Sequence, residues 1–145
     1  MPSLSSETLH ASCVAVRGVA VLISGRSGTG KSDLALRLLD RGAKLVSDDY
    51  TVVKRVRGEL VACAPATIAG RMEVRGIGIV SFDHVSDVPV GLFVDLDRSA
   101  DRLPVDGEEV TIAGVAVPSM ALDNLEGSAP IKVELALARR NGGSG

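Results

Sequence analysis

Val19-Ala-Val-Leu-Ile-Ser-Gly-Arg-Ser-Gly-Thr-Gly-Lys-Ser32 decides the fold, because it joins an apolar run to a glycine-rich loop. The apolar run, residues 19–24, predicts a buried strand. Residues 31–41 carry leucines at helical spacing and predict an amphipathic helix, which Gly42 is placed to end. Residues 43–47 predict the next strand, so we expect a βαβ unit whose two strands pair in parallel.

The glycine-rich loop fits the pattern G-x-x-x-x-G-K-[S/T] at every fixed position. In such a loop, backbone N–H groups and the start of the following helix surround phosphate oxygens. Lys31 would place its charge at the β- and γ-phosphates of a nucleoside triphosphate, and Ser32 would offer its hydroxyl to Mg²⁺. The alternative is a glycine-rich turn without a ligand. The predicted nucleotide-binding residues are Gly25, Arg26, Ser27, Gly28, Thr29, Gly30, Lys31 and Ser32.

Two adjacent carboxylates, Asp48 and Asp49, follow the second predicted strand. A helix of roughly ten residues leads away from the loop, and a strand of about five residues returns over nearly the same length. We therefore expect both aspartates beside the phosphate loop, where α/β sheets bind ligands. One carboxylate could hold Mg²⁺ and the other could act as a general base. The alternative is a surface turn, and the residues do not decide which aspartate would be the base.

Charged residues interrupt the apolar, strand-like segment Arg71-Met-Glu-Val-Arg-Gly-Ile-Gly-Ile79. On a strand, Glu73 and Arg75 would face the same side. They could bind Mg²⁺ and phosphate, or they could form a structural ion pair on a solvated face. Periodicity leaves both interpretations open.

The rest of the chain predicts a mixed sheet with few helices. Residues 51–63 have the pattern of a hairpin. Residues 90–96 and 110–117 predict two further strands, and residues 130–140 predict a closing helix. We expect one catalytic domain over residues 1–140 and a disordered, glycine-rich tail over residues 141–145.

The composition excludes several classes of protein. The 145 residues carry 16 basic and 18 acidic side chains, and the net charge of −2 argues against a nucleic-acid partner. No apolar run reaches the roughly 18 residues of a membrane span, and no secretory leader is recognisable, so we expect a cytoplasmic protein without membrane contact. Cys13 and Cys63 stand alone in the sequence and predict buried free thiols.

Five segments together resemble the catalytic domain of the bacterial HPr kinase/phosphorylase family. They are Leu9-His10, the phosphate loop with Asp33, Arg41-Gly42 with Asp48-Asp49, Met72-Glu-Val-Arg-Gly-Ile-Gly-Ile-Val80, and Asp101-Arg102-Leu103. The resemblance covers about residues 10–140 and implies an α/β fold like that of phosphoenolpyruvate carboxykinase. It also implies ATP- and Mg²⁺-dependent phosphorylation of a serine on an HPr-like phosphocarrier protein, and a homo-oligomer, usually a hexamer. We expect the N-terminal domain usual in the family to be absent.

The resemblance also implies roles for individual residues. Ser32 and Glu73 would hold Mg²⁺, and Asp49, with Asp48 beside it, would take the proton of the acceptor serine. The side chains that complete the active site would be His10, Lys31 and Arg102.

The sequence departs from the family in one segment that bears on function. A basic stretch of the form Pro-Val-x-x-Gly-Arg-Asn is replaced by Asp123-Asn-Leu-Glu-Gly-Ser-Ala129, in which Ser128 stands where the family has a basic residue. This departure predicts weak or absent phosphorylase activity. Two alternatives to a protein kinase stay open: a nucleotide-dependent regulatory module without turnover, and a small-molecule kinase. The second is disfavoured because no arginine-rich lid segment is present.

Overall fold

The computed structural model describes residues 6–26, 30–98, 107–123 and 126–142, and residues 140–142 are described by their backbone alone. The elements, in chain order, are β1 (Ser6–Leu9), β2 (Ala11–Val16), β3 (Val19–Ser24), α1 (Lys31–Asp40), β4 (Lys44–Ser47), β5 (Thr51–Val56), β6 (Glu59–Cys63), a 3₁₀ turn (Ala66–Ile68), β7 (Arg71–Val74), β8 (Gly78–Ser81), β9 (Val88–Asp95), β10 (Glu109–Ile112), β11 (Val115–Ala121) and α2 (Ala129–Gly142). The predicted α/β class with a mixed sheet is confirmed. No helix among the described residues is long and apolar enough to cross a membrane.

Strand β2 lies next to the edge of the sheet, between β3 and the edge strand β4, and pairs antiparallel with both. The two strands that flank α1 therefore run in the same direction but do not pair with each other, so the predicted direct pairing was wrong. All six residues of β2 are buried. Its run of small apolar side chains fits a strand covered on both faces.

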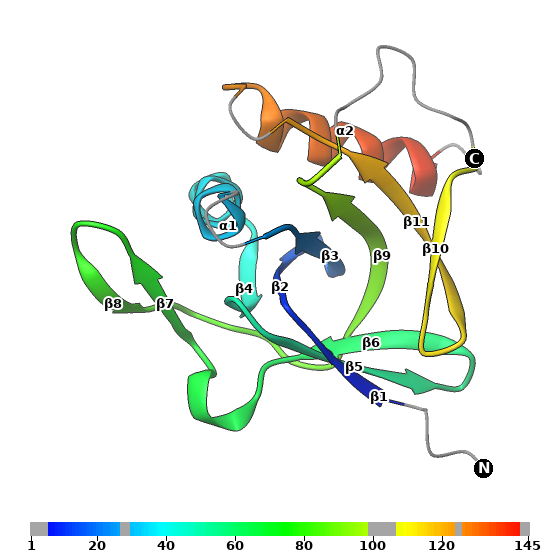
Figure 1. The fold of residues 1–145 in the computed structure, drawn as a ribbon, viewed down its shortest axis with the longest axis horizontal. Helices are drawn as coiled ribbons and strands as arrows, with labels where there is room; N and C mark the ends of the chain where they lie inside the picture. The colour runs from blue at the N-terminus through cyan, green and yellow to red at the C-terminus, as the bar shows by residue number, and fades with distance from the viewer. Residues whose placement is uncertain (1–5, 27–29, 99–106, 124–125, 143–145) are drawn as a thin grey trace.

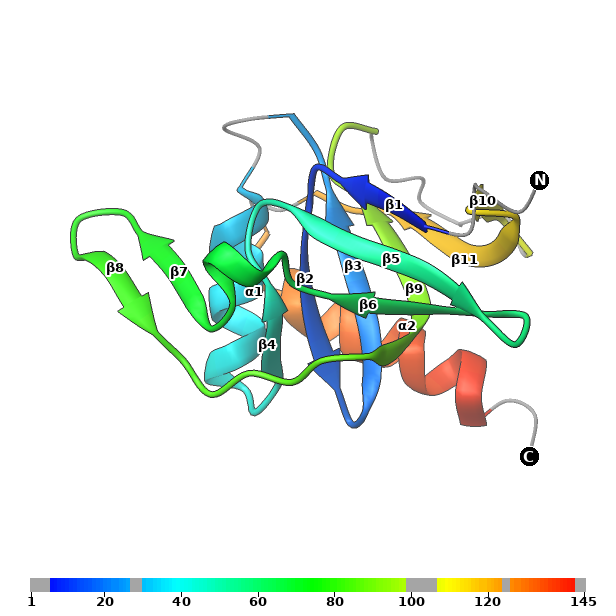
Figure 2. The ribbon, with the colours of Figure 1, turned by 90° about the horizontal axis from the view of Figure 1, so that it is seen from below.

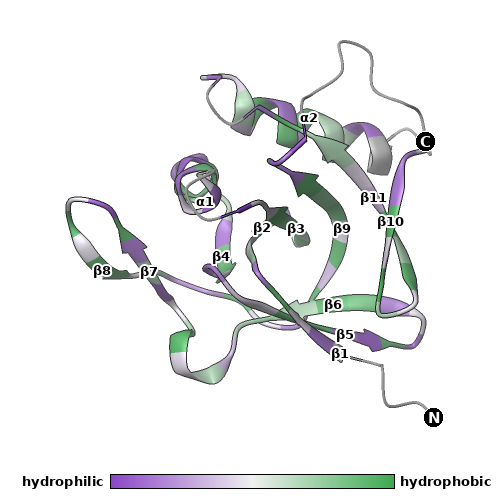
Figure 3. Cartoon of the chain, in the orientation of Figure 1, coloured by the Kyte–Doolittle hydropathy of each residue, from purple (hydrophilic) through white to green (hydrophobic). Residues whose placement is uncertain are grey.

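The central strands are covered on both sides. Helices α1 and α2 lie against one face, and the ribbon of β1, β5 and β6 lies across the other (Figures 1 and 2). The β10–β11 hairpin lies beside β9, with which β11 pairs in parallel. One buried cluster fills the space under the helices and a second fills the space over the ribbon. Strands β3 and β9 are accordingly hydrophobic over most of their length (Figure 3).

The sheet curls so that strands far apart in its order meet again. The order is β1-β5-β6-β9-β3-β2-β4, yet His10 alone joins β1 to β2, and residues 48–50 alone join β4 to β5. These two short connections are the crossings of the sheet. The Thr51 hydroxyl, just after one crossing, donates a hydrogen bond of 2.7 Å to the carbonyl of Ala11, just after the other. Both crossings therefore lie at one seam of the curled sheet.

Some predicted elements differ from the observed ones. The predicted strand 110–117 is a hairpin, whose turn has positive φ at Ala113 and Gly114. Segment 71–79 also forms a hairpin, β7–β8, and Arg75 lies in its turn, so Glu73 and Arg75 do not share a strand face. Helix α2 includes the first two residues of the predicted tail, and residues 143–145 lie outside the described ranges.

The two cysteines are both free. Cys13 is buried, as predicted, and this burial raises the pKa of its thiol. Cys63 is only partly buried, so for this residue the prediction of a buried thiol was wrong.

A glycine in β9 tests the packing of the central strands. A Cβ at Gly91 would lie 2.4 Å from Val19 Cγ1, so we predict that Gly91→Ala lowers the free energy of unfolding by about 1–3 kcal/mol. Gly127, where an added Cβ meets nothing within 4 Å, provides the control Gly127→Ala. Urea denaturation measures both variants, and equal stabilities would contradict the packing described for β3 and β9.

Candidate active site

The phosphate loop follows the end of β3, and its described residues Gly25 and Arg26 contact Lys31. Gly30 precedes α1 with φ of 93°, a left-handed conformation that glycine adopts without strain. The Lys31 side chain is buried, and its Nζ donates to the carbonyls of Gly25 at 2.8 Å and Arg26 at 3.4 Å. The predicted residues Ser27, Gly28 and Thr29 lie outside the described ranges.

Asp48 lies beside the start of α1, where the lengths of helix and strand place it. Its carboxylate is nearly buried and accepts three hydrogen bonds. The donors are the Ser32 hydroxyl at 2.6 Å, the Ser12 hydroxyl at 3.1 Å and the Glu73 backbone N–H at 3.4 Å. These donors come from three different elements, so this carboxylate joins α1, β2 and β7.

Asp49 forms the centre of a tight turn that directs its carboxylate outward. Its φ is 69°, and the Tyr50 N–H donates to the Asp48 carbonyl at 2.7 Å, the pattern of a strained γ-turn. The Asp49 N–H is held by the Ser12 hydroxyl at 3.1 Å. The carboxylate is 53% exposed and forms a hydrogen bond of 3.0 Å with His10 Nε2. Strain of this kind is typical of functional positions.

The predicted metal ligands Ser32 and Glu73 both lie next to Asp48. The Glu73 side chain is exposed, while its neighbour Met72 is buried in the core. Within the described ranges, no group of three or more His, Cys, Asp or Glu side chains could hold a metal ion. A hydroxyl and one or two carboxylates suit Mg²⁺, which takes its remaining ligands from phosphates and water. The predicted Arg102 lies outside the described residues.

Three site residues escaped the sequence prediction. Ser12 is a lone hydroxyl in an apolar strand, and nothing in the sequence distinguishes it. Tyr50 stacks on His10, with ring centroids 4.9 Å apart, and only its position next to the aspartates could have drawn attention to it. Asp97 accepts a hydrogen bond of 3.1 Å from the Arg26 N–H. A signal for Asp97 existed, because it follows an apolar strand at the carboxyl edge of the sheet.

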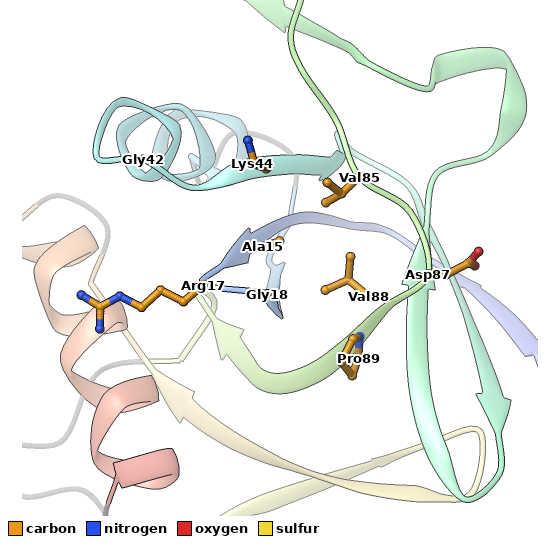
Figure 4. A pocket seen from close by; sticks show the side chains of 9 residues that line it. All are labelled: Ala15, Arg17, Gly18, Gly42, Lys44, Val85, Asp87, Val88 and Pro89. Carbon is orange, nitrogen blue, oxygen red and sulfur yellow. The ribbon is translucent and has the colours of Figure 1, made fainter.

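A pocket of about 480 Å³ lies at the opposite end of β3 from the phosphate loop. Its walls include Ala15, Val85, Val88 and Pro89. Three charged residues, Arg17, Lys44 and Asp87, line it, and the side chains of Arg17 and Asp87 extend away from its centre on opposite sides (Figure 4). Because its polar groups do not converge, we assign it no chemistry.

Most of the chain is similar to proteins of one family. A family model described as the HPr Serine kinase C-terminal domain matches residues 3–139. HPr kinase/phosphorylase of Clostridium tetani is 37% identical over 132 residues, which cover 82% of this chain and 43% of that protein. The corresponding protein of Alkaliphilus metalliredigens is also 37% identical, over 79% of this chain and 41% of its own length. The chain thus spans less than half of these relatives.

A solved structure agrees with the sequence relatives. The Hpr(Ser) kinase/phosphatase from Coxiella burnetii superimposes with a TM-score of 0.80 and 28% identity, over 96% of this chain and 99% of that one. The similarity therefore extends over the fold as well as over the sequence motifs.

The site geometry predicts a structural cost for losing Ser12. In Ser12→Ala the Asp49 N–H loses its acceptor and the Asp48 carboxylate loses a donor in a buried position, so the free energy of unfolding should fall by about 1–3 kcal/mol. Ser86→Ala, at an exposed position, should change it by less than about 0.5 kcal/mol. Chemical denaturation compares the two, and an unaltered Ser12→Ala protein would contradict the described contacts.

Proposed function

This chain belongs to the HPr serine kinase C-terminal domain family, whose model matches nearly all of it, and from that premise we propose that it transfers the γ-phosphoryl group of ATP, with Mg²⁺, to a serine of an HPr-like phosphocarrier protein. One observation carries the proposal. The hydrogen bond between Ser32 and Asp48 brings two adjacent carboxylates against a phosphate loop, one buried and one turned outward. A nucleotide site and a proton acceptor for an incoming hydroxyl then lie side by side.

The loop residues bind and orient the triphosphate in this proposal. Phosphoryl transfer depends on positioning and on stabilising charge at the phosphate oxygens. Lys31 supplies a fixed positive charge, and the loop N–H groups with the start of α1 supply aimed donors. Ser32 and Glu73 would hold Mg²⁺, with Asp48 fixing the Ser32 hydroxyl. When bound, the ion neutralises charge that develops on the transferred phosphoryl group.

The acceptor hydroxyl loses its proton to Asp49. The carboxylate is exposed to an approaching protein, whereas that of Asp48 is nearly buried and already accepts three hydrogen bonds. His10 bonds to the Asp49 carboxylate and so fixes its direction. These contacts favour Asp49 over Asp48 as the base. We assign Arg102 to the site by family resemblance alone.

Four wider features complete the proposal. By family resemblance the chain acts as a homo-oligomer, a hexamer, and works in the cytoplasm. Its acceptor belongs to a phosphotransferase system. The kinase domain covers residues 1–140 of this sequence.

An acceptor panel tests the proposal against its two rivals. The chain is incubated with γ-labelled ATP and Mg²⁺, together with the HPr-like proteins of its host, an unrelated protein rich in serine, or a mixture of small hydroxylated metabolites. We expect label on a serine of an HPr-like protein alone. Label on small molecules would favour a small-molecule kinase, and ATP binding without any transfer would favour a regulatory module.

Substitution of the two aspartates separates their roles. We predict that Asp49→Asn binds ATP normally but loses transfer by about 10²–10⁴-fold, because the amide cannot take the serine proton. Asp48→Asn should weaken nucleotide binding as well, since Asp48 holds the Ser32 hydroxyl. Equilibrium binding and initial rates of transfer measure both effects. The roles are reversed if Asp48→Asn alone loses transfer with binding intact.

The metal requirement tests Glu73. We predict that Glu73→Gln raises the Mg²⁺ concentration for half-maximal transfer about tenfold, the size of effect known even for outer-shell partners of metal ligands. Glu59→Gln, on the exposed end of β6, is the matched control and should leave the titration unchanged. If the two variants behave alike, Glu73 has a structural role instead.

We predict that phosphorolysis is weak or absent. Inorganic phosphate attacking a phosphoserine needs positive charge nearby. The segment that is basic in the family carries Asp123 and Glu126 here, and Lys132, a nearby cation, is paired with Glu126. The measurement mixes phosphorylated acceptor, enzyme and phosphate without nucleotide and follows pyrophosphate release.

Ser128→Arg is the matched variant for that measurement, because it restores a basic residue where the family has one. We expect it to raise pyrophosphate release while the forward rate changes little. Release by the wild-type chain at the forward kinase rate would contradict the prediction.

A further inference from the structure

The phosphate loop is also held by a contact with the segment after β9, which has no role in the proposed function. Strand β9 lies parallel to β3, with Asp95 opposite Ser24, and the Leu96 N–H donates to the Ser24 carbonyl at 2.8 Å. The end of β9 therefore lies next to the start of the phosphate loop. Asp97, two residues after the end of β9, contacts Arg26.

Asp97 contacts Arg26 through one carboxylate oxygen. Oδ1 accepts the Arg26 backbone N–H at 3.1 Å and the Arg26 Nε–H at 3.2 Å. The Arg26 side chain is 82% exposed, so the ion pair itself contributes little. A carboxylate bonded to a backbone N–H is a stronger, charge-assisted interaction. That bond, followed by the contacts with the Arg26 side chain, holds the pKa of Asp97 below its ordinary value.

The Asp97 carboxylate is itself oriented by its neighbours. The Asp97 N–H donates to Asp95 Oδ1 at 2.8 Å, and Arg98 Nε donates to Asp95 Oδ2 at 3.2 Å. Arg98 also bonds Glu108 at 2.7 Å. Contacts with Asp95 and Glu108 therefore hold the turn after β9, in addition to its contact with Arg26.

Asp97 and Lys31 bind opposite ends of the peptide group between Gly25 and Arg26. The Arg26 N–H and the Gly25 carbonyl belong to one planar trans peptide, so they point in opposite directions. Asp97 binds the N–H, and Lys31 Nζ binds the carbonyl at 2.8 Å. The two bonds together fix the rotation of this peptide and, through it, the place of the Lys31 ammonium group.

We propose that Asp97 is a positioning residue for triphosphate binding: by accepting the Arg26 N–H, it fixes the Gly25–Arg26 peptide and so sets where Lys31 presents its charge. Asp97 acts through the loop and does not touch the nucleotide. The inference rests on the proposed nucleotide site. The contact itself belongs to the nucleotide-free chain and can be measured there.

The experiment has two arms, each run on wild type, Asp97→Ala, Asp97→Asn and the control Asp83→Ala, an exposed carboxylate between β8 and β9. The first arm measures hydrogen exchange at the Arg26 amide without nucleotide. The second measures ATP affinity with Mg²⁺ by equilibrium titration. Asp97→Ala should speed exchange and weaken affinity, each about tenfold, the low end for a hydrogen bond to a charged group. Asp97→Asn keeps an acceptor oxygen and should restore most of both, while Asp83→Ala should match wild type.

Several results would overturn the inference. One is Arg26 exchange in Asp97→Ala at the wild-type rate; another is faster exchange with unchanged ATP affinity. If Asp97→Ala lowers both the melting temperature and the ATP affinity, and Asp97→Asn restores neither, the residue only stabilises the fold. If the wild-type chain binds no ATP, the proposed function fails, and the claim that Asp97 fixes the loop peptide stands or falls on the exchange rate.

Discussion

The hydrogen bond of 2.6 Å between the Ser32 hydroxyl and Asp48 ties the first turn of α1 to the end of β4. A nearly buried carboxylate lowers the stability of the fold unless it is hydrogen-bonded, so Asp48 needs further donors beside Ser32. Ser12 of β2 and the Glu73 N–H of β7 fill those places. No buried side-chain nitrogen or oxygen among the described residues lacks a partner. The site is therefore held by the same contacts that hold the strands around it.

The curled sheet explains why polar groups gather at one place. A strand interior satisfies its own backbone, but a chain that crosses from one part of a sheet to another leaves N–H and carbonyl groups to be paired. Both crossings, at His10 and at residues 48–50, fall at the same seam. There the Ser12 hydroxyl accepts the Asp49 N–H, and the Thr51 hydroxyl donates to the Ala11 carbonyl. The γ-turn at Asp49 is the strained element of this seam, and it turns a carboxylate toward solvent beside the phosphate loop.

Local patterns were predictable and long-range placements were not. The apolar run of β3, the leucine spacing of α1 and the return of β4 are set by neighbouring residues, so these elements and the position of Asp48 beside Ser32 were predicted correctly. Strand β2 precedes β3 and β4 in the sequence but lies between them in the sheet, and no local sequence pattern predicts that placement. The turn at Ala113–Gly114 was missed because alanine rarely adopts positive φ. Contacts such as Asp97 with Arg26 depend on which strands become neighbours, and they needed the fold.

Calorimetric titration with ATP tests most directly whether the fold is arranged around a triphosphate site. We predict one Mg²⁺-dependent site per chain, with affinity reduced by at least about tenfold in Lys31→Ala, because the lost ammonium group would face the β- and γ-phosphates. Melting curves of the nucleotide-free proteins serve as the check that Lys31→Ala is folded. Equal affinity in the folded variant and the wild type, or no heat of binding in the wild type, would contradict the account.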